Sequence, residues 1–493
     1  MLFNSISFLF FFSFVYIVYW SIPEKNRKAF LLLAGIVFYS FFSLSLSFHF
    51  LITVGINYGL YRLIINLKDK KWPLRTSVIL NILNLGFFKY FYFFNRVLAD
   101  ATGYPFFEDI TSIIQIALPM AISFYSFQMI AAAVDTKRNP PAIPVSIFDF
   151  YLFVVFFPVL IAGPIMRMGE FFPNLSNLKP DKDKLYRASY LMMSGLIKKV
   201  LVADPISTTI QPIFAEPGIY DSYSLFMAGI CYSIQVYCDF SGLTDMARSV
   251  ALFLGFDIPE NFKAPFFSTS GSELWKRWHI TLSFWLRDYI YFPLGGSRVS
   301  EWHGYFNLII TMTLGGFWHG ADYTFVVWGF YWGVILSAER MLEDKYKIPL
   351  TPKKSFPLKV FKAGIVFVLF SISGLMFRSN DASSMVLLFH GLITNSSDFI
   401  LESLSLGSSQ WVIHAGALVG GDDFFFMEKI SNLERVSYMF TVMVLFHWVQ
   451  YSPEILDKFR KHDSWLMPVL GAVTILMLAM LSQDGGEFIY YKF

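Results

Sequence analysis

The chain has 493 residues, of which 55% are hydrophobic, 19% aromatic and 15% charged, with a formal net charge of +3. A soluble domain carries about 25% charged residues, so this composition excludes a soluble multidomain protein and indicates an integral membrane protein. The small net charge gives no indication of a nucleic-acid partner.

Apolar segments of about 17 to 25 residues, the length that crosses a hydrocarbon core of about 30 Å, recur along the chain. We expect spans at residues 2–20, 29–47, 50–67, 76–95, 112–133, 146–163, 185–204, 222–238, 304–316, 320–338, 363–377, 435–451 and 464–482. The fold class is therefore an all-α polytopic membrane protein with roughly 11 to 13 crossings. Between about residues 239 and 300, prolines and Gly-Ser clusters interrupt the apolar pattern. This region predicts re-entrant and interfacial helices, because irregular backbone at membrane depth must be buried in protein or line a polar cavity.

The basic residues gather in loops near residues 25–28, 68–75, 137–138 and 340–362. The positive-inside rule places these loops in the cytoplasm and both chain ends on the opposite side. No Lys or Arg precedes the first apolar segment, so we expect a retained span rather than a cleaved signal. We predict one integral membrane domain over residues 1–493, divided into N-terminal helices (1–111), a core with both candidate histidines (112–338), and C-terminal helices with an outer-face tail (339–493).

The two cysteines, Cys231 and Cys238, favour buried apolar packing over a disulfide or a metal site. The sequence contains no GxSxG, GxGxxG, Walker A or HExxH motif. A serine hydrolase, nucleotide motor or zinc protease of the usual kind is therefore excluded, and we predict no metal.

His319 is the first candidate for chemistry. Gly315, Gly316 and Gly320 surround it, and this lack of side chains allows backbones or a substrate to approach the imidazole. Asp322 follows at helical spacing, from which a carboxylate can reach and orient a ring nitrogen. An imidazole exchanges a proton near neutral pH, so His319 is either a general base or a buried histidine bonded to a neighbouring helix.

His279 lies in the segment WKRWHITLSFW, in which Trp275, Trp278 and Trp285 fall near one face at helical spacing with Arg277 beside them. The pattern indicates an interfacial amphipathic helix. It is compatible with an aromatic belt that binds lipid phosphates and with a second reactive histidine.

A polar stretch at residues 235–249 places Asp239, Ser241 and Asp245 in apolar surroundings. Charged groups at membrane depth must be paired or face a polar cavity. The two aspartates therefore either pair with Arg248 or with the basic residues near His279, or line a polar route to the histidines.

Six sequence blocks, in order along the chain, resemble the membrane-bound O-acyltransferase family, and within it the bacterial branch similar to alginate O-acetyltransferases. The WKRWH and GGFWHG blocks are the most specific of them. The blocks lie at residues 123–139, 156–167, 235–247, 261–298, 313–329 and 488–493.

The resemblance implies a ring of transmembrane helices around a central tunnel. It implies that His319 is the catalytic base and His279 a second histidine near the reaction centre. Asp239, Ser241, Trp318, Asp322 and Arg277 would line the substrate route. Lys276 and Tyr323 stand where the family pattern has Arg and Trp.

The implied activity is O-acylation, in particular O-acetylation, of an extracytoplasmic polysaccharide by a bacterial cytoplasmic-membrane enzyme. The donor would be cytoplasmic acetyl-CoA or another acyl thioester, with no covalently bound cofactor. The implied partners are membrane lipids and an outer-face SGNH or esterase-like transferase, with no nucleic acid. Tyr490 in FIYYKF matches a tyrosine proposed to carry the acyl group in similar proteins, and an interfacial aromatic anchor is the alternative.

Two other classes remain open from the sequence. One is a transporter that moves an acyl-bearing lipid or intermediate without making bonds, and the other is a multispan scaffold. Inverted repeats of broken helices would favour transport, and the sequence shows none.

Overall fold

The structure is a computed structural model that describes residues 1, 3–160, 162–176, 179–348, 355–395 and 430–451. The regular elements of these residues are helices, and one isolated bridge joins Phe262 and Trp278. The all-α prediction is confirmed for the described chain. The predicted final span and the tail with Tyr490 lie outside the described residues.

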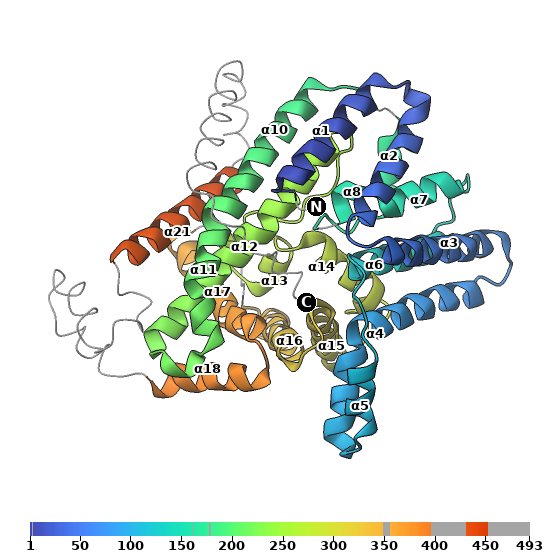
Figure 1. The fold of residues 1–493 in the computed structure, drawn as a ribbon. Helices are drawn as coiled ribbons and strands as arrows, with labels where there is room; N and C mark the ends of the chain where they lie inside the picture. The colour runs from blue at the N-terminus through green and yellow to red at the C-terminus, as the bar shows by residue number, and fades with distance from the viewer. Residues whose placement is uncertain (2, 161, 177–178, 349–354, 396–429, 452–493) are drawn as a thin grey trace. The chain divides into compact units, whose positions relative to one another are not determined.

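Figure 1 labels the described α-helices except α9. The helices are α1 (Ile6–Ser21), α2 (Glu24–Ser40), α3 (Leu44–Asn66), α4 (Lys71–Thr102), α5 (Phe106–Ile113), α6 (Ile122–Arg138), α7 (Ile147–Val155), α8 (Phe157–Leu160), α9 (Met168–Phe171), α10 (Lys182–Leu196), α11 (Asp204–Ala215), α12 (Ser222–Phe253), α13 (Gly271–Trp275), α14 (Ile280–Leu286), α15 (Glu301–His319), α16 (Tyr323–Asp344), α17 (Phe356–Arg378), α18 (Ala382–Thr394) and α21 (Ile430–Tyr451). Short 3₁₀ and π-helical stretches connect some of them, at Phe172–Ser176, Ile197–Ala203, Pro217–Ile219, Pro265–Phe267 and Arg287–Tyr291.

The chain forms two compact units. The first contains residues 1–192 and 243–260, and the second contains residues 193–242 and 261–493. The prediction of one integral membrane domain stays a prediction.

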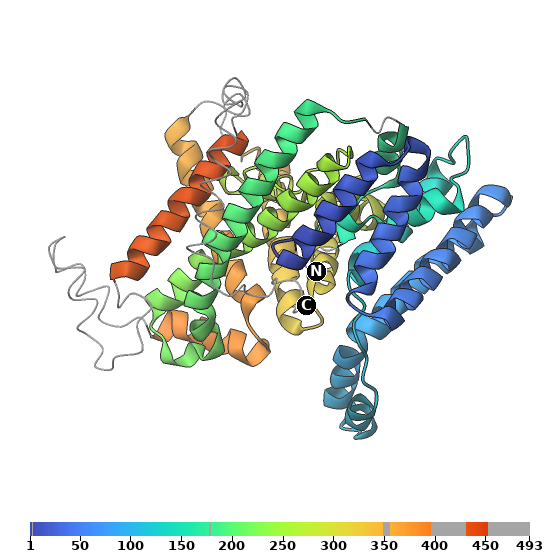
Figure 2. The same cartoon turned by 45° about the horizontal axis from the view of Figure 1, so that its top comes forward.

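In the first unit, α1 and α2 form a hairpin that both ribbon views show in dark blue (Figures 1 and 2). Helices α3 and α4 also pack together, and a buried polar cluster joins them. Ser77 Oγ donates a hydrogen bond of 2.9 Å to Asn57 Oδ1, and Asn81 Nδ2 donates one of 2.8 Å to the same oxygen. Buried polar groups stabilise a helix contact only when they are hydrogen-bonded, and these three bond to one another.

Three helices of the described chain, α3, α4 and α17, are long and apolar enough to cross a membrane. Helices α1 and α18 are apolar but shorter. A ring of roughly 11 to 13 crossings stays a prediction. The span expected at residues 112–133 is wrong, because α5 ends at Ile113 and α6 begins at Ile122. Ala121 between them has a φ of 59°, and this left-handed residue precludes one continuous helix.

In the second unit, α15 and α16 form an antiparallel hairpin, which Figures 1 and 2 show side by side. Two glycines permit its close packing. A Cβ at Gly316 would overlap the carbonyl oxygen of Phe325, and one at Gly329 would overlap that of Met312. Gly316 therefore allows the backbones of the two helices to pack closely. The sequence left open whether this glycine makes room for a backbone or for a substrate.

Candidate active site

His319 is the last residue of α15 and is 4% exposed. Helix α15 ends there because Gly320 is extended, with a φ of −159°. The imidazole lies among three aromatic rings, at centroid distances of 4.9 Å from Trp318, 5.2 Å from Trp328 and 5.1 Å from Phe377. Three helices, α15, α16 and α17, thus enclose the ring.

Asp322 does not continue the helix of His319. It is the N-cap of α16, and its carboxylate accepts a hydrogen bond of 3.2 Å from the backbone N–H of Thr324. The helical spacing predicted between His319 and Asp322 is wrong, since one helix ends at the histidine and the next begins after the aspartate. An N-cap carboxylate satisfies a helix-terminal N–H, which is a structural role in itself.

His279 lies in a buried turn, so the continuous interfacial helix predicted for residues 275–285 is wrong. Helix α13 ends at Trp275, and α14 begins only at Ile280. His279 has a φ of 42°, in the left-handed region that a histidine seldom adopts, and is 1% exposed. Its ring lies edge-on to Phe240 at 4.7 Å and 6.5 Å from the ring of His319. The turn therefore brings together two histidines that stand 40 residues apart in the sequence.

Asn261, which sequence reasoning did not identify, fixes this turn. Its backbone oxygen accepts a hydrogen bond of 3.0 Å from the N–H of Ile280. Its side-chain Oδ1 accepts one of 2.7 Å from Thr281 Oγ1. These bonds hold the residues that follow His279, because a buried turn needs partners for its backbone groups.

Glu339 of α16 holds the other end of the same segment, and sequence reasoning also missed it. Its carboxylate accepts hydrogen bonds from the backbone N–H groups of Gly271, at 2.6 Å, and Ser272, at 2.9 Å. Trp275, at the end of α13, packs edge-on against two tryptophans of α16, Trp328 and Trp332. The segment that leads to His279 is thus attached to the helix that also contacts His319.

We expect Glu339→Gln to destabilise the protein. A glutamine offers one acceptor oxygen where two N–H groups need acceptors, and its NH₂ group would face a second donor. Hydrogen bonds to charged groups contribute about 1.5 to 3 kcal/mol, so the midpoint of thermal unfolding in detergent should fall. The matched control is Glu343→Gln, which neutralises an exposed carboxylate one turn further along α16. Equal midpoints for the two variants would contradict the role of Glu339.

Arg277 forms an ion pair with Glu273, at 2.8 Å, and donates a hydrogen bond of 3.3 Å to the carbonyl of Lys263. Its guanidinium lies 5.5 Å from the ring centre of Tyr451. The structure therefore places Arg277 in contacts within its own segment and with the end of α21.

Asp239 takes part in a buried ion cluster with a lysine that sequence reasoning did not consider. Lys199 Nζ lies 2.9 Å from Asp239 and 2.7 Å from Asp204, and all three residues are at most 5% exposed. Lys199 belongs to the π-helical stretch Ile197–Ala203. Arg248, one of the partners that the sequence left open, pairs with Glu260 instead, at 3.3 Å.

The other residues of the polar stretch, Ser241 and Asp245, are buried. Both cysteines are buried and free, as predicted. Within the described residues, no group of three or more His, Cys, Asp or Glu side chains could hold a metal ion.

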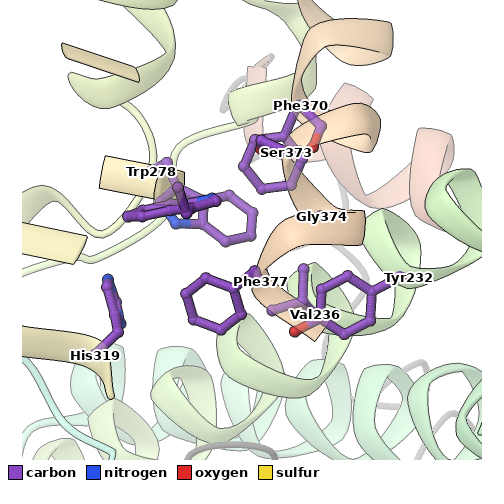
Figure 3. Close-up of a pocket in the computed structure, with 9 residues that line it drawn as sticks. Tyr232, Val236, Trp278, His319, Phe370, Ser373, Gly374 and Phe377 are labelled. Carbon is purple, nitrogen blue, oxygen red and sulfur yellow. Dashed lines mark hydrogen bonds between the residues drawn. The ribbon is translucent and has the colours of Figure 1, made fainter. Parts of the chain in front are cut away.

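A small cavity adjoins His319. Its volume, counted as space open to the centre of a water molecule, is about 20 Å³, enough for about one water. Figure 3 shows His319 on one side, Tyr232 and Val236 of α12 on the other, and the ring of Phe377 between them in this view. Of the predicted site residues, only His319 is among those that line this cavity in the described chain.

Comparison with known proteins identifies the family of the chain. Residues 79–378 match the model of MBOAT, the membrane-bound O-acyltransferase family. The chain belongs to this family and is a membrane acyltransferase.

Three relatives illustrate the range of the similarity. The "Probable alginate O-acetylase AlgI" of Azotobacter vinelandii is 35% identical, over 77% of this chain and 76% of the relative. The peptidoglycan O-acetyltransferase of Helicobacter pylori is 33% identical, over 94% of this chain and 91% of the relative. The teichoic acid D-alanyltransferase of Bacillus subtilis is 28% identical, over 46% of this chain and 61% of the relative. The names refer to acyl transfer to alginate, peptidoglycan and teichoic acid.

Proposed function

We propose that this protein is an O-acetyltransferase that passes an acyl group from a cytoplasmic thioester to the hydroxyl of an extracytoplasmic polysaccharide, with His319 as the base. The observation that carries the proposal is the position of His319, which is buried in an aromatic enclosure and lines a cavity. Two relatives named for O-acetyl transfer match the chain over at least 77% of its length, and they support acetyl as the acyl group.

The chemistry needs a base because a hydroxyl is a poor nucleophile while it keeps its proton. His319 takes that proton as the oxygen attacks the thioester carbonyl. The tetrahedral oxyanion then collapses, the C–S bond breaks, and the departing sulfur receives the proton from the imidazolium. The products are an ester and a free thiol.

His279 is suited to hold a substrate in the same enclosure. Neither of its ring nitrogens has a hydrogen-bond partner in the described part of the chain, and its ring lies 6.0 Å from that of Trp318. Buried polar nitrogens are normally hydrogen-bonded, so a substrate would supply what the protein does not. Trp318 contacts both histidine rings and would fix their relative orientation.

The remaining predicted residues have supporting rather than direct roles in this proposal. Asp239 would keep the interior polar through its pair with Lys199, with Ser241 on the same helix. Arg277 would attract the anionic donor near the cytoplasmic face, and Asp322 would fix the start of α16 beside the base. Tyr490, outside the described residues, would carry the acyl group on the outer face.

The donor would be acetyl-CoA or another acyl thioester, with no covalently bound cofactor. An outer-face SGNH or esterase-like transferase would complete the transfer in the bacterial cytoplasmic membrane, with both chain ends outside. A cavity that holds about one water molecule cannot admit the donor. The aromatic side chains around His319 must therefore move when the thioester binds.

We expect the purified protein in lipid vesicles to release free CoA from acetyl-CoA labelled in the acetyl group and, once the outer-face transferase is supplied, to pass the label to an added O-acetylatable polysaccharide. Thiol release measured with a chromogenic disulfide and label measured on the polymer should rise together. Label that crosses the vesicle membrane without thiol release would identify a transporter instead. If no label crosses the membrane and no thiol is released, the result favours the scaffold.

A further inference from the structure

The hydroxyl of Tyr232 is a polar group for which the fold provides no partner. Tyr232 belongs to α12 and is 1% exposed. Its oxygen is buried and has no hydrogen-bond partner within the residues that the structure describes. A buried tyrosine hydroxyl usually finds a partner, because leaving it unbonded destabilises the fold relative to a phenylalanine of the same shape.

Tyr232 lines the same small cavity as His319. Figure 3 shows Tyr232 on the wall formed by α12 and α17, with its oxygen directed toward the His319 side. The same wall carries a second hydroxyl, that of Ser373, but Ser373 donates its proton to the carbonyl of Phe370 at 2.7 Å. Of these two hydroxyl groups, only that of Tyr232 does not donate a hydrogen bond to another of the described residues.

The position of the Tyr232 ring is fixed by its neighbours. A Cβ at Gly374 of α17 would lie 3.0 Å from Tyr232 Cδ1, closer than an ordinary contact, so the ring packs tightly against the backbone of α17 there. The ring of Phe214 packs edge-on at 6.0 Å. On the next residue, Ser233 Oγ bonds to Ser371 Oγ at 3.1 Å and joins α12 to α17. A donor held in place before the reaction is the arrangement that stabilises developing charge most effectively.

We propose that Tyr232 is a further catalytic residue, whose hydroxyl donates a hydrogen bond to the carbonyl oxygen of the acyl thioester. The inference rests on the proposed function and adds a residue to it. When the acceptor oxygen attacks and its proton passes to His319, the carbonyl π-electrons move onto this oxygen, and the Tyr232 hydrogen bond strengthens. The proton of Tyr232 stays on the phenol throughout, and the bond weakens again when the C–S bond breaks. The acyl group displaces the ring of Phe377, which lies between the two residues in Figure 3.

Tyr232→Phe tests the proposal cleanly, because it removes one oxygen that makes no hydrogen bond in the described fold. Loss of an oxyanion donor lowers kcat by about 10²- to 10³-fold, and we expect that fall with little change in KM. The thermal midpoint should stay equal or rise, since an unbonded buried hydroxyl is removed. A purely structural role for Tyr232 predicts no such fall in kcat.

The matched control is Tyr237→Phe, on the same helix. Tyr237 is also fully buried, but its hydroxyl bonds to Gln450 Oε1 at 3.1 Å and it does not line the cavity. This variant should lose stability and keep its kcat. Wild-type turnover with an unchanged kcat in Tyr232→Phe would overturn the proposal for Tyr232 and leave the proposed function standing. A fall in kcat matched by a fall in the thermal midpoint would also overturn it. No turnover by the wild-type protein would overturn both.

Discussion

Replacing His319 by alanine should reduce acyl transfer by about 10²- to 10⁴-fold, the usual contribution of a positioned general base. Without the imidazole, no group among the described lining residues of the cavity can take a proton from a hydroxyl near neutral pH, since the others are aromatic, aliphatic or hydroxyl side chains. The measurement is thiol release from acetyl-CoA by purified variant and wild-type protein at equal concentrations in the same lipid.

Alanine also leaves space among three aromatic rings, so lost activity must be separated from lost packing. Added imidazole should restore part of the rate in His319→Ala, because the vacated volume adjoins the existing cavity. His303→Ala is the control, since His303 is exposed and its Nδ1 bonds to Ser300 Oγ at 2.6 Å. A His319→Ala variant that folds and keeps the wild-type rate would refute the assignment of the base.

The features predicted correctly from the sequence are those that depend on local composition. Long apolar segments gave the helices α3, α4 and α17 at the expected places, although each begins five to seven residues before the expected start and α4 ends seven residues after the expected end. The interruption predicted from about residue 239 begins only after α12 ends at Phe253, so the irregular backbone expected at residues 239–253 is wrong. Beyond it the prediction is correct, since the short helices α13 and α14 and short 3₁₀ and π-helical stretches follow up to Tyr291. The two cysteines are buried, as their apolar sequence context predicted.

The features missed depend on contacts between distant segments or on single backbone angles. His279 fits a helical pattern of tryptophans, yet its φ of 42° ends that pattern, and no residue type in the segment signals the turn. Glu339 and Asn261 act through backbone groups of residues about 20 or more positions away, for which spacing rules give no indication. The sequence offered Arg248 or the basic residues near His279 as cations for Asp239, whereas the structure pairs Asp239 with Lys199, and Arg248 with Glu260.

Replacing Lys199 by methionine should have the largest effect on stability. The change removes the ammonium group that lies within 2.9 Å of both Asp204 and Asp239, and it leaves the two carboxylates buried. Removing one partner of a buried ion pair typically destabilises a protein by about 3 to 5 kcal/mol, because the remaining charge is uncompensated. We expect a large fall in folded yield and in thermal midpoint in detergent. Lys345→Met, at the exposed end of α16, should leave both unchanged.

The cause of that loss can be separated from the loss of lysine packing by removing the negative charges as well. In the triple variant Lys199→Met, Asp204→Asn, Asp239→Asn, the cluster is neutral and close to the original volume. Neutral replacement of a buried ion cluster is often tolerated, so most of the stability should return. If the triple variant is as unstable as Lys199→Met, the uncompensated carboxylates are not the cause. If the triple variant is stable but its kcat stays low, the charges of the cluster matter for acyl transfer as well as for folding. This is the result expected if Asp239 keeps the interior polar.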